Sequence, residues 1–109
     1  MTERRRSVVW TAVAARDMER LALRLAEDAP LRAERIIDRI IDRCESLATL
    51  SDRGRTPPEL RPVSDRTWLE VIVSPWRIVY RVVGNVVEIH GVLDGRRDLR
   101  DLLLDRLLD

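Results

Sequence analysis

The sequence predicts an α+β fold, in which a helical hairpin packs on a mostly antiparallel four-stranded sheet and a short helix ends the chain. Three observations support this fold. Apolar residues recur at helical spacing in two segments before residue 50, whereas apolar and polar residues alternate over 76–83. Gly84-Asn85 is a typical two-residue turn between strands. The expected order is β-α-α-β-β-β-α, in a single domain over residues 1–109.

In the N-terminal half, β-branched and aromatic residues over 7–11 predict the first strand. The Thr11 hydroxyl can cap a helix that extends to about residue 28, and Pro30 fits the start of a second helix. The linker between them allows only an antiparallel hairpin. The second helix has a wide apolar stripe, which consists of Ala33, Ile36, Ile37, Ile40, Ile41, Cys44, Leu47 and Ala48.

After a loop over 51–58, three strands are expected over 67–73, 76–83 and 86–93. Asp98 can cap a last helix, which is too short to be stable alone in water. It must therefore dock on the sheet, on a twin subunit, or in a groove that a partner helix also uses. One face of the middle strand carries Trp76, Ile78, Tyr80 and Val82, and the other carries Arg77, Val79, Arg81 and Val83. The apolar ridge of the last helix consists of Leu99, Leu102, Leu103, Leu107 and Leu108.

The composition excludes several kinds of chemistry. All 20 basic residues are Arg, so no lysine can form a Schiff base or bind phosphate in a P-loop. The net charge of +1 argues against unselective binding of nucleic acid. One Cys and one His permit neither a disulfide within the chain nor multi-histidine metal ligation, and we expect no metal and no cofactor. No apolar run predicts a membrane span or a secretory signal, so the expected compartment is the cytoplasm.

Several segments together resemble the RelE/ParE-type toxins of bacterial type II toxin–antitoxin systems. The most specific piece is the Arg77 to Arg81 strand, Arg-Ile-Val-Tyr-Arg, followed one hairpin later by Gly-Arg-Arg-Asp at 95–98. The other matching segments are Val9-Trp10-Thr11, Ala33 to Ile41, and Leu50 to Leu60 with its Gly-Arg and Pro-Glu-Leu. The resemblance covers nearly the whole chain and implies the fold given above.

The resemblance implies two alternative activities, because the RelE branch cuts mRNA on the ribosome and the ParE branch inhibits DNA gyrase. Arg77 and Arg97 match phosphate-binding arginines of the nucleases. The lysines that nucleases often carry on the second strand are replaced by Trp68-Leu69-Glu70, and the terminal tyrosine by Leu102-Leu103-Leu104. Proton transfer would depend on Glu59 or His90.

These departures favour a ParE-like inhibitor of DNA gyrase that a cognate antitoxin neutralises. The alternatives are a ribosome-dependent mRNA endonuclease and a non-toxic interaction module of the same fold. The expected partners are the antitoxin and gyrase, or the ribosome and mRNA, and a toxin dimer or a toxin–antitoxin hetero-oligomer is conceivable. The residues expected to bind the target or the antitoxin are Arg55, Arg77, Arg81, Arg96, Arg97 and Asp98.

Each of these residues also has a purely structural interpretation. Arg77 and Arg81 could occupy a solvated face of the sheet, and Arg96 and Arg97 could form surface salt bridges with neighbouring aspartates. His90 is expected to bond Glu88 or the backbone, and Cys44 to be a small buried hydrophobe. Two arginine stripes are expected to lie on solvated helix faces, with pairs to the acids that stand three residues further on, Glu19, Glu27, Asp38 and Asp42. The stripes are Arg16, Arg20 and Arg24, and Arg35, Arg39 and Arg43.

Overall fold

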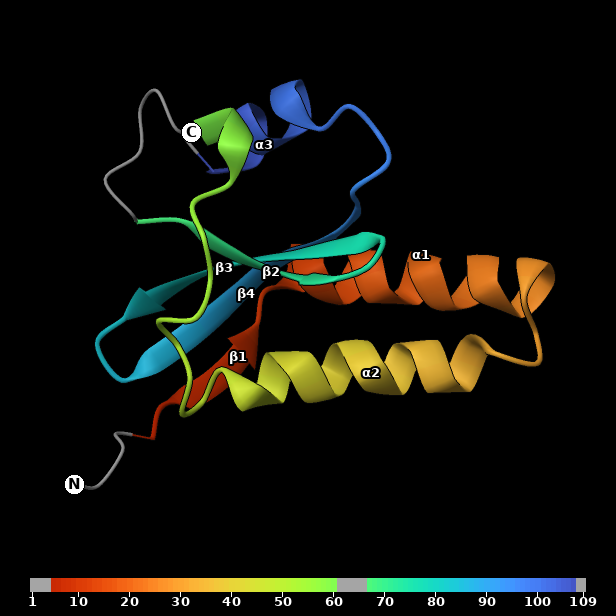
Figure 1. The fold of residues 1–109 in the computed structure, drawn as a ribbon, viewed down its shortest axis with the longest axis horizontal. Helices are drawn as coiled ribbons and strands as arrows, with labels where there is room; N and C mark the ends of the chain where they lie inside the picture. Colours follow the sequence, from red (N-terminus) through yellow and green to blue (C-terminus); the bar gives the residue numbers. More distant parts are fainter. Residues whose placement is uncertain (1–4, 61–66, 108–109) are drawn as a thin grey trace.

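The computed structural model describes residues 5–60 and 67–107, and it confirms the predicted order of elements (Figure 1). Four strands form one sheet in the order β1-β4-β3-β2. The first strand lies parallel to β4, and the other neighbours are antiparallel. The strands are β1 (Ser7–Trp10), β2 (Leu69–Val73), β3 (Trp76–Val83) and β4 (Val86–Asp94).

Helices α1 (Ala12–Asp28) and α2 (Ala33–Ser46) lie side by side on one face of the sheet (Figure 1). The predicted cap is present, since the Thr11 hydroxyl oxygen accepts a hydrogen bond of 3.1 Å from the Ala14 amide. The second helix begins at Ala33, three residues after Pro30, because Pro30 to Arg32 form the turn that reverses the chain.

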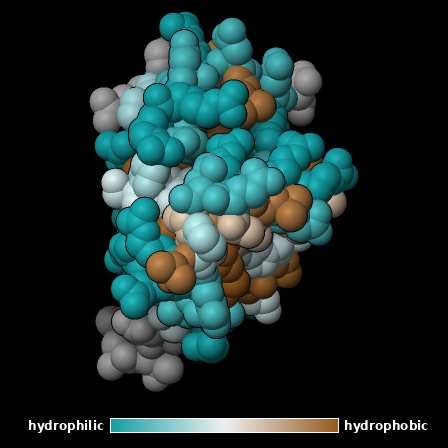
Figure 2. All heavy atoms as spheres, turned by 90° about the vertical axis from the view of Figure 1, so that its right-hand side faces the viewer, coloured by the Kyte–Doolittle hydropathy of each residue, from teal (hydrophilic) through white to brown (hydrophobic). Residues whose placement is uncertain are grey.

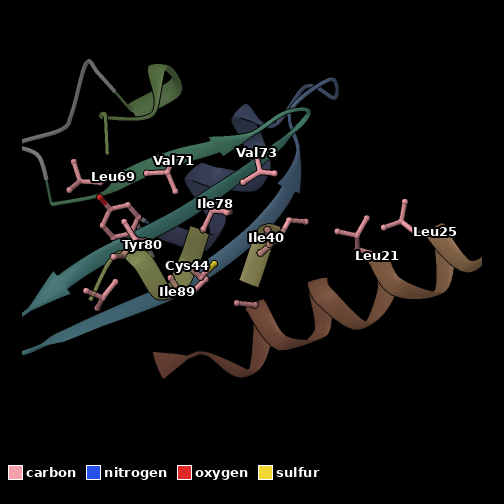
Figure 3. Close-up of a cluster of buried hydrophobic side chains, with 14 residues drawn as sticks. Leu21, Leu25, Ile40, Cys44, Leu69, Val71, Val73, Ile78, Tyr80 and Ile89 are labelled. Atoms are coloured by element: carbon pink, nitrogen blue, oxygen red, sulfur yellow. The ribbon is translucent and has the colours of Figure 1, made fainter. Parts of the chain in front are cut away.

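The larger apolar cluster fills the space between the sheet and the α1–α2 pair (Figure 3). Ile40 and Cys44 from α2 meet Ile78 and Tyr80 from β3, and all four side chains are fully buried. Burial raises the pKa of the Cys44 thiol to about 12, because a thiolate would be desolvated there. Cys44 is therefore the buried hydrophobe that the sequence predicts.

The opposite face of the sheet is covered by α3 (Arg100–Leu107) and by a 3-10 turn, η1 (Pro58–Leu60). A second apolar cluster lies beneath them, and its buried members are Leu60, Trp68, Val79, Leu93, Leu99, Leu103 and Leu107. Of the three arrangements open to the last helix, the structure thus shows docking on its own sheet. Asp98 accepts a hydrogen bond of 3.2 Å from the amide of Arg100, the first residue of α3, but the first helical bond is accepted by the Leu99 carbonyl, so Asp98 lies one residue before the predicted cap position. Leu102 of the predicted ridge is 38% exposed, and Leu108 lies outside the described residues.

Two local features fix the β3–β4 hairpin. Gly84 adopts a φ of +58° in the predicted two-residue turn, which a residue with a side chain rarely does. Further along, Val79 pairs with Gly91 and Tyr80 with Ile89, so His90 is an extra residue in β4. The side chains of β4 after His90 therefore lie on the opposite face from the one that strict alternation predicts.

The bulge changes the face that Val92 occupies. Strict alternation along β4 would place Val92 on the same face as Glu88 and His90, but it packs in the larger cluster under α1 and α2. Within the described part of the chain, no helix has the length and apolarity needed to cross a membrane.

Candidate functional site

Arg77, the strand arginine of the resemblance, is 8% exposed and lies on the sheet face that carries η1 and α3. Its guanidinium donates two hydrogen bonds of 2.6 Å to the two carboxylate oxygens of Glu59. Its Nε donates a third, of 2.7 Å, to Oε1 of Glu70. The structural interpretation that Arg77 occupies a solvated face is therefore wrong, because η1 and the loop before it cover this part of the sheet.

Glu70 connects Arg77 to a second arginine. Its side chain is completely buried, and Oε2 accepts a hydrogen bond of 2.9 Å from Nε of Arg55. Arg55 also pairs with the Glu70 backbone as an isolated β-bridge, while its side chain remains 56% exposed. Two arginines and two glutamates thus form a neutral chain of ion pairs. We call Arg55, Glu59, Glu70 and Arg77 the charged quartet.

The electrostatics of the charged quartet oppose proton transfer. The hydrogen bonds from Arg77 hold the pKa of Glu59 below its usual range, and those from Glu59 and Glu70 raise the pKa of Arg77. A general base works best with a pKa near the operating pH, and a lowered carboxyl pKa moves away from it. Both carboxylate oxygens of Glu59 already accept bonds from Arg77.

His90 belongs to a separate group of side chains on the same face. Its Nε2 lies 3.0 Å from Oε1 of Glu88, as the structural interpretation predicts, and its ring meets Trp68 edge to face at 4.8 Å. Arg81 donates a hydrogen bond of 2.6 Å to the same Glu88 oxygen and lies over the Trp68 ring. His90 and Arg81 together lower the pKa of Glu88. The structure therefore places His90 with a surface ion pair.

The two arginines after β4 differ from each other. Arg96 forms the predicted salt bridge, with Nη2 2.8 Å and Nε 3.0 Å from the Asp94 carboxylate. That pairing lowers the pKa of Asp94 to about 2. The exposed Arg97 side chain has no ion pair within residues 5–60 and 67–107, and it lines a cavity beside α1. The four residues of the nuclease alternative, Arg77, Arg97, Glu59 and His90, are thus divided among three places.

Sequence reasoning missed the ion pair between the buried Asp17 on α1 and the half-buried Arg106 on α3. Arg106 donates two hydrogen bonds, of 2.8 and 3.0 Å, to the Asp17 carboxylate. Asp17 also accepts a hydrogen bond of 3.0 Å from the amide of Val92. The pairing of β1 with β4 ends at Ile89, so at Val92 a side chain takes the place of the neighbouring strand. One sequence signal was available, because Asp17 is a charged residue within the apolar stripe of Ala14 and Leu21.

The two arginine stripes also depart from expectation. None of the predicted pairs between these arginines and acids three residues further on is formed in the described part of the chain. Arg43, which has Ser46 three residues further on, donates a hydrogen bond of 3.1 Å to the Ile72 carbonyl of β2. Within that same part, no three His, Cys, Asp or Glu side chains gather so that they could hold a metal ion.

Comparison with solved structures identifies the class of fold. A chromosomal ParDE toxin–antitoxin system from P. aeruginosa matches with a TM-score of 0.67 and 18% identity, over 84% of this chain and 97% of that chain. The RelBE2 toxin–antitoxin complex from Mycobacterium tuberculosis matches with a TM-score of 0.59 and 19% identity, over 83% and 98%. The fold is that of the RelE/ParE-type toxins.

The sequence identifies the branch within that class. The family of ParE toxins of type II toxin–antitoxin systems, parDE, matches residues 8–99, which include the whole sheet except Ser7 at the start of β1. The chain therefore belongs to the family of ParE toxins of type II toxin–antitoxin systems. No curated protein matches it in sequence.

Proposed function

We propose that this toxin acts by binding and inhibiting DNA gyrase in the cytoplasm, and that its antitoxin neutralises it there. One observation carries the choice between gyrase inhibition and RNA cleavage. Arg77, the arginine that would grip the scissile phosphate, already gives its hydrogen bonds to Glu59 and Glu70. To act as nuclease residues, both Arg77 and Glu59 would have to abandon charge-assisted bonds of 2.6 Å.

The residues singled out in the sequence differ in how well a protein partner can reach them. Arg55, Arg96, Arg97 and Asp98 are exposed, so a protein partner can reach them. Arg81 is half-buried and shares Glu88 with His90. Arg77 acts indirectly in this proposal, because it holds η1 and the Arg55 loop in place through Glu59 and Glu70.

A supercoiling assay tests the proposal. Purified toxin at micromolar concentration is expected to block gyrase supercoiling of relaxed plasmid, and addition of the antitoxin is expected to restore it. Arg97→Ala should weaken the inhibition, and Arg16→Ala on the exposed side of α1 is the matched control. Full gyrase activity at micromolar toxin would contradict the proposal.

The same preparation separates the nuclease alternative. Toxin is added to a translating extract, and mRNA 5′ ends are mapped. Under the proposal no new ends appear. Toxin-dependent cuts within codons would instead establish cleavage and contradict the proposal.

A further inference from the structure

The two outer strands of the sheet, β1 and β2, differ in how their free edges are covered. On β2, Glu70 exchanges two backbone hydrogen bonds with Arg55, of 2.7 and 2.9 Å, and Arg43 donates one of 3.1 Å to the Ile72 carbonyl. Paired segments and cationic side chains are common ways to keep a sheet edge from pairing with another chain. Within residues 5–60 and 67–107, most of the free edge of β1 has no such cover.

The backbone groups on the free edge of β1 follow from its pairing with β4. The amides of Ser7 and Thr11 donate to carbonyls of β4, so the odd-numbered residues of β1 turn their backbone groups toward that strand. The N–H and C=O groups of Val8 and Trp10 therefore point away from the sheet. They form no hydrogen bond with the part of the chain that the structure describes.

The side chains of this edge are uncharged and largely apolar. Val8 and Trp10 pack partly against the larger apolar cluster, whereas Val9 lies on the opposite face and is 44% exposed. We call Val8, Val9 and Trp10 the β1 edge. It offers apolar area and unpaired backbone groups together.

Other exposed apolar side chains lack this combination. Leu31 in the α1–α2 connection is fully exposed, and Figure 2 shows apolar surface among hydrophilic side chains at this end of the molecule. Single apolar side chains on a surface are common and need no partner. The backbone of the neighbouring helices is hydrogen-bonded within each helix. The β1 edge is therefore the better candidate for pairing with another chain.

The geometry of the β1 edge matches a second copy of itself. In an antiparallel pair, two opposite residues exchange both of their backbone hydrogen bonds. A two-fold axis at Val9 places Val8 opposite Trp10 of the partner subunit, and Trp10 opposite Val8 of the partner subunit. Every outward backbone group of the two edges then gains a partner. Val9 faces Val9 of the partner subunit in the pair between them, which has no hydrogen bonds.

The ends of the β1 edge agree with this register. The Arg6 amide already donates a hydrogen bond of 2.7 Å to the Ala48 carbonyl, so the free edge begins at Val8. Arg6 would stand opposite Ala12 of the partner subunit, where the partner chain has left its strand and begins α1. The free length of one edge therefore matches the strand length of the other.

The charges around the β1 edge are also complementary. The exposed Glu45 on α2 lines one cavity with Val8, and it forms no ion pair within the described residues. The two-fold axis brings the start of the partner's α1 to this end of the strand, and the first turn of α1 contains no acidic residue. A carboxylate is stabilised near the positive N-terminal end of a helix. The same arrangement at the edge of β2 would bring Arg43 against Arg43 of the partner subunit.

We propose that the free toxin forms a symmetric dimer through the β1 edge, in which the two sheets join into one continuous antiparallel-paired sheet. The inference does not depend on gyrase as target, and its test contains no gyrase. A short strand pair buries little area, so the dimer is expected at concentrations on the order of hundreds of micromolar and dissociates on dilution.

Disulfide trapping tests the register. Across a pair without hydrogen bonds the two Cα atoms stand about 4.5 Å apart, which permits a disulfide. Oxidised Val9→Cys is therefore expected to form a covalent dimer at least about tenfold faster than Ser7→Cys. Ser7 is the matched control, because it is exposed on the same face of the same strand but would lie about 14 Å from Ser7 of the partner subunit. The native Cys44 is buried and does not compete.

Sedimentation of the reduced proteins tests the dimer without a cross-link. Val9→Lys places like charges directly opposite each other and removes an apolar contact, so it is expected to raise the dissociation constant about tenfold. Val83→Lys is the matched control, since Val83 is 49% exposed on the same sheet but lies outside the β1 edge. It should dimerise as the parent does, and urea unfolding verifies that both variants fold.

Several results would overturn the dimer. Equal trapping of Ser7→Cys and Val9→Cys would indicate random collision, and faster trapping of Ser7→Cys would indicate another register. A parent protein that remains monomeric at its highest soluble concentration also contradicts the proposal. If Val9→Lys instead weakens binding of the purified antitoxin or of gyrase to a monomeric parent, the β1 edge belongs to that partner and not to a second copy.

Discussion

The two faces of the sheet are stabilised differently. The face under α1 and α2 buries a large cluster of apolar side chains, and Tyr80 bonds the Ser51 carbonyl and the Gly54 amide at its margin. The face under η1 and α3 has a smaller apolar cluster and places the buried Glu70 and Arg77 beside it. A fold that uses charges to close one face cannot also offer those charges to a substrate.

The largest effect is expected from removing one member of the charged quartet. Arg77→Met should lower the free energy of unfolding by about 3–5 kcal/mol, because Glu70 keeps only the exposed Arg55 as partner. Urea unfolding measures this loss. The double variant Arg77→Met with Glu70→Leu should recover most of it, since an apolar pair replaces a buried ion pair. If Arg77→Met costs no more than Arg81→Met, the charged quartet does not stabilise this face.

A cavity in the larger apolar cluster should lower the free energy of unfolding more than a cavity in the smaller cluster. Ile40→Ala is expected to lose about 3–4 kcal/mol, because the large cluster surrounds this side chain on all sides. Leu103→Ala should lose about 2–3 kcal/mol, since a short terminal helix can shift to fill the space. The same urea titrations compare the two. A larger loss at Leu103 would show that α3 is as rigidly packed as α2.

A smaller loss of stability is expected from breaking the ion pair between Asp17 and Arg106, which connects α1 on one face of the sheet to α3 on the other. Arg106→Gln removes the charge that binds Asp17, and should lower the free energy of unfolding by about 1–2 kcal/mol. Amide exchange should accelerate chiefly in α3, because the Asp17 bond to Val92 remains. Arg100→Gln, on an exposed position of the same helix, is the control. Uniform acceleration over α1 and α2 would mean that the pair stabilises the whole fold.

Acid should destabilise the face of the charged quartet. The hydrogen bonds from Arg77 hold the pKa of Glu59 below its usual range. A carboxyl group whose pKa is lower in the folded state contributes its stability above the unfolded value and loses it as the pH falls. The free energy of unfolding should therefore decline from about pH 5 downward. In Glu59→Gln the decline should be shallower, and an unchanged slope would contradict the assignment.

Much of the fold follows from local patterns, but the site does not. The stripe of α2, the alternation of β3 and the Gly84 turn each act over a few residues, so the sequence predicts them well. The burial of Arg77 depends on Glu59, 18 positions earlier, and the Asp17 pair spans 89 positions. Such contacts arise only when η1 and α3 dock. The unpaired arginine stripes were also misjudged, because helical spacing permits ion pairs without enforcing them.

The smallest effect is expected in the Arg106→Gln variant, on the rate at which a reagent labels the Cys44 thiol. This rate shows whether the two faces of the sheet open together. The buried thiol, with a pKa raised to about 12, should react with a disulfide reagent at pH 8 only when α2 leaves the sheet. Arg106→Gln loosens α3 on the other face. If the faces open independently, this variant labels at the parent rate in low urea, while Ile40→Ala labels much faster. Equal acceleration in both variants would mean that α3 cannot move without the core, so that a partner displacing α3 would unfold the toxin.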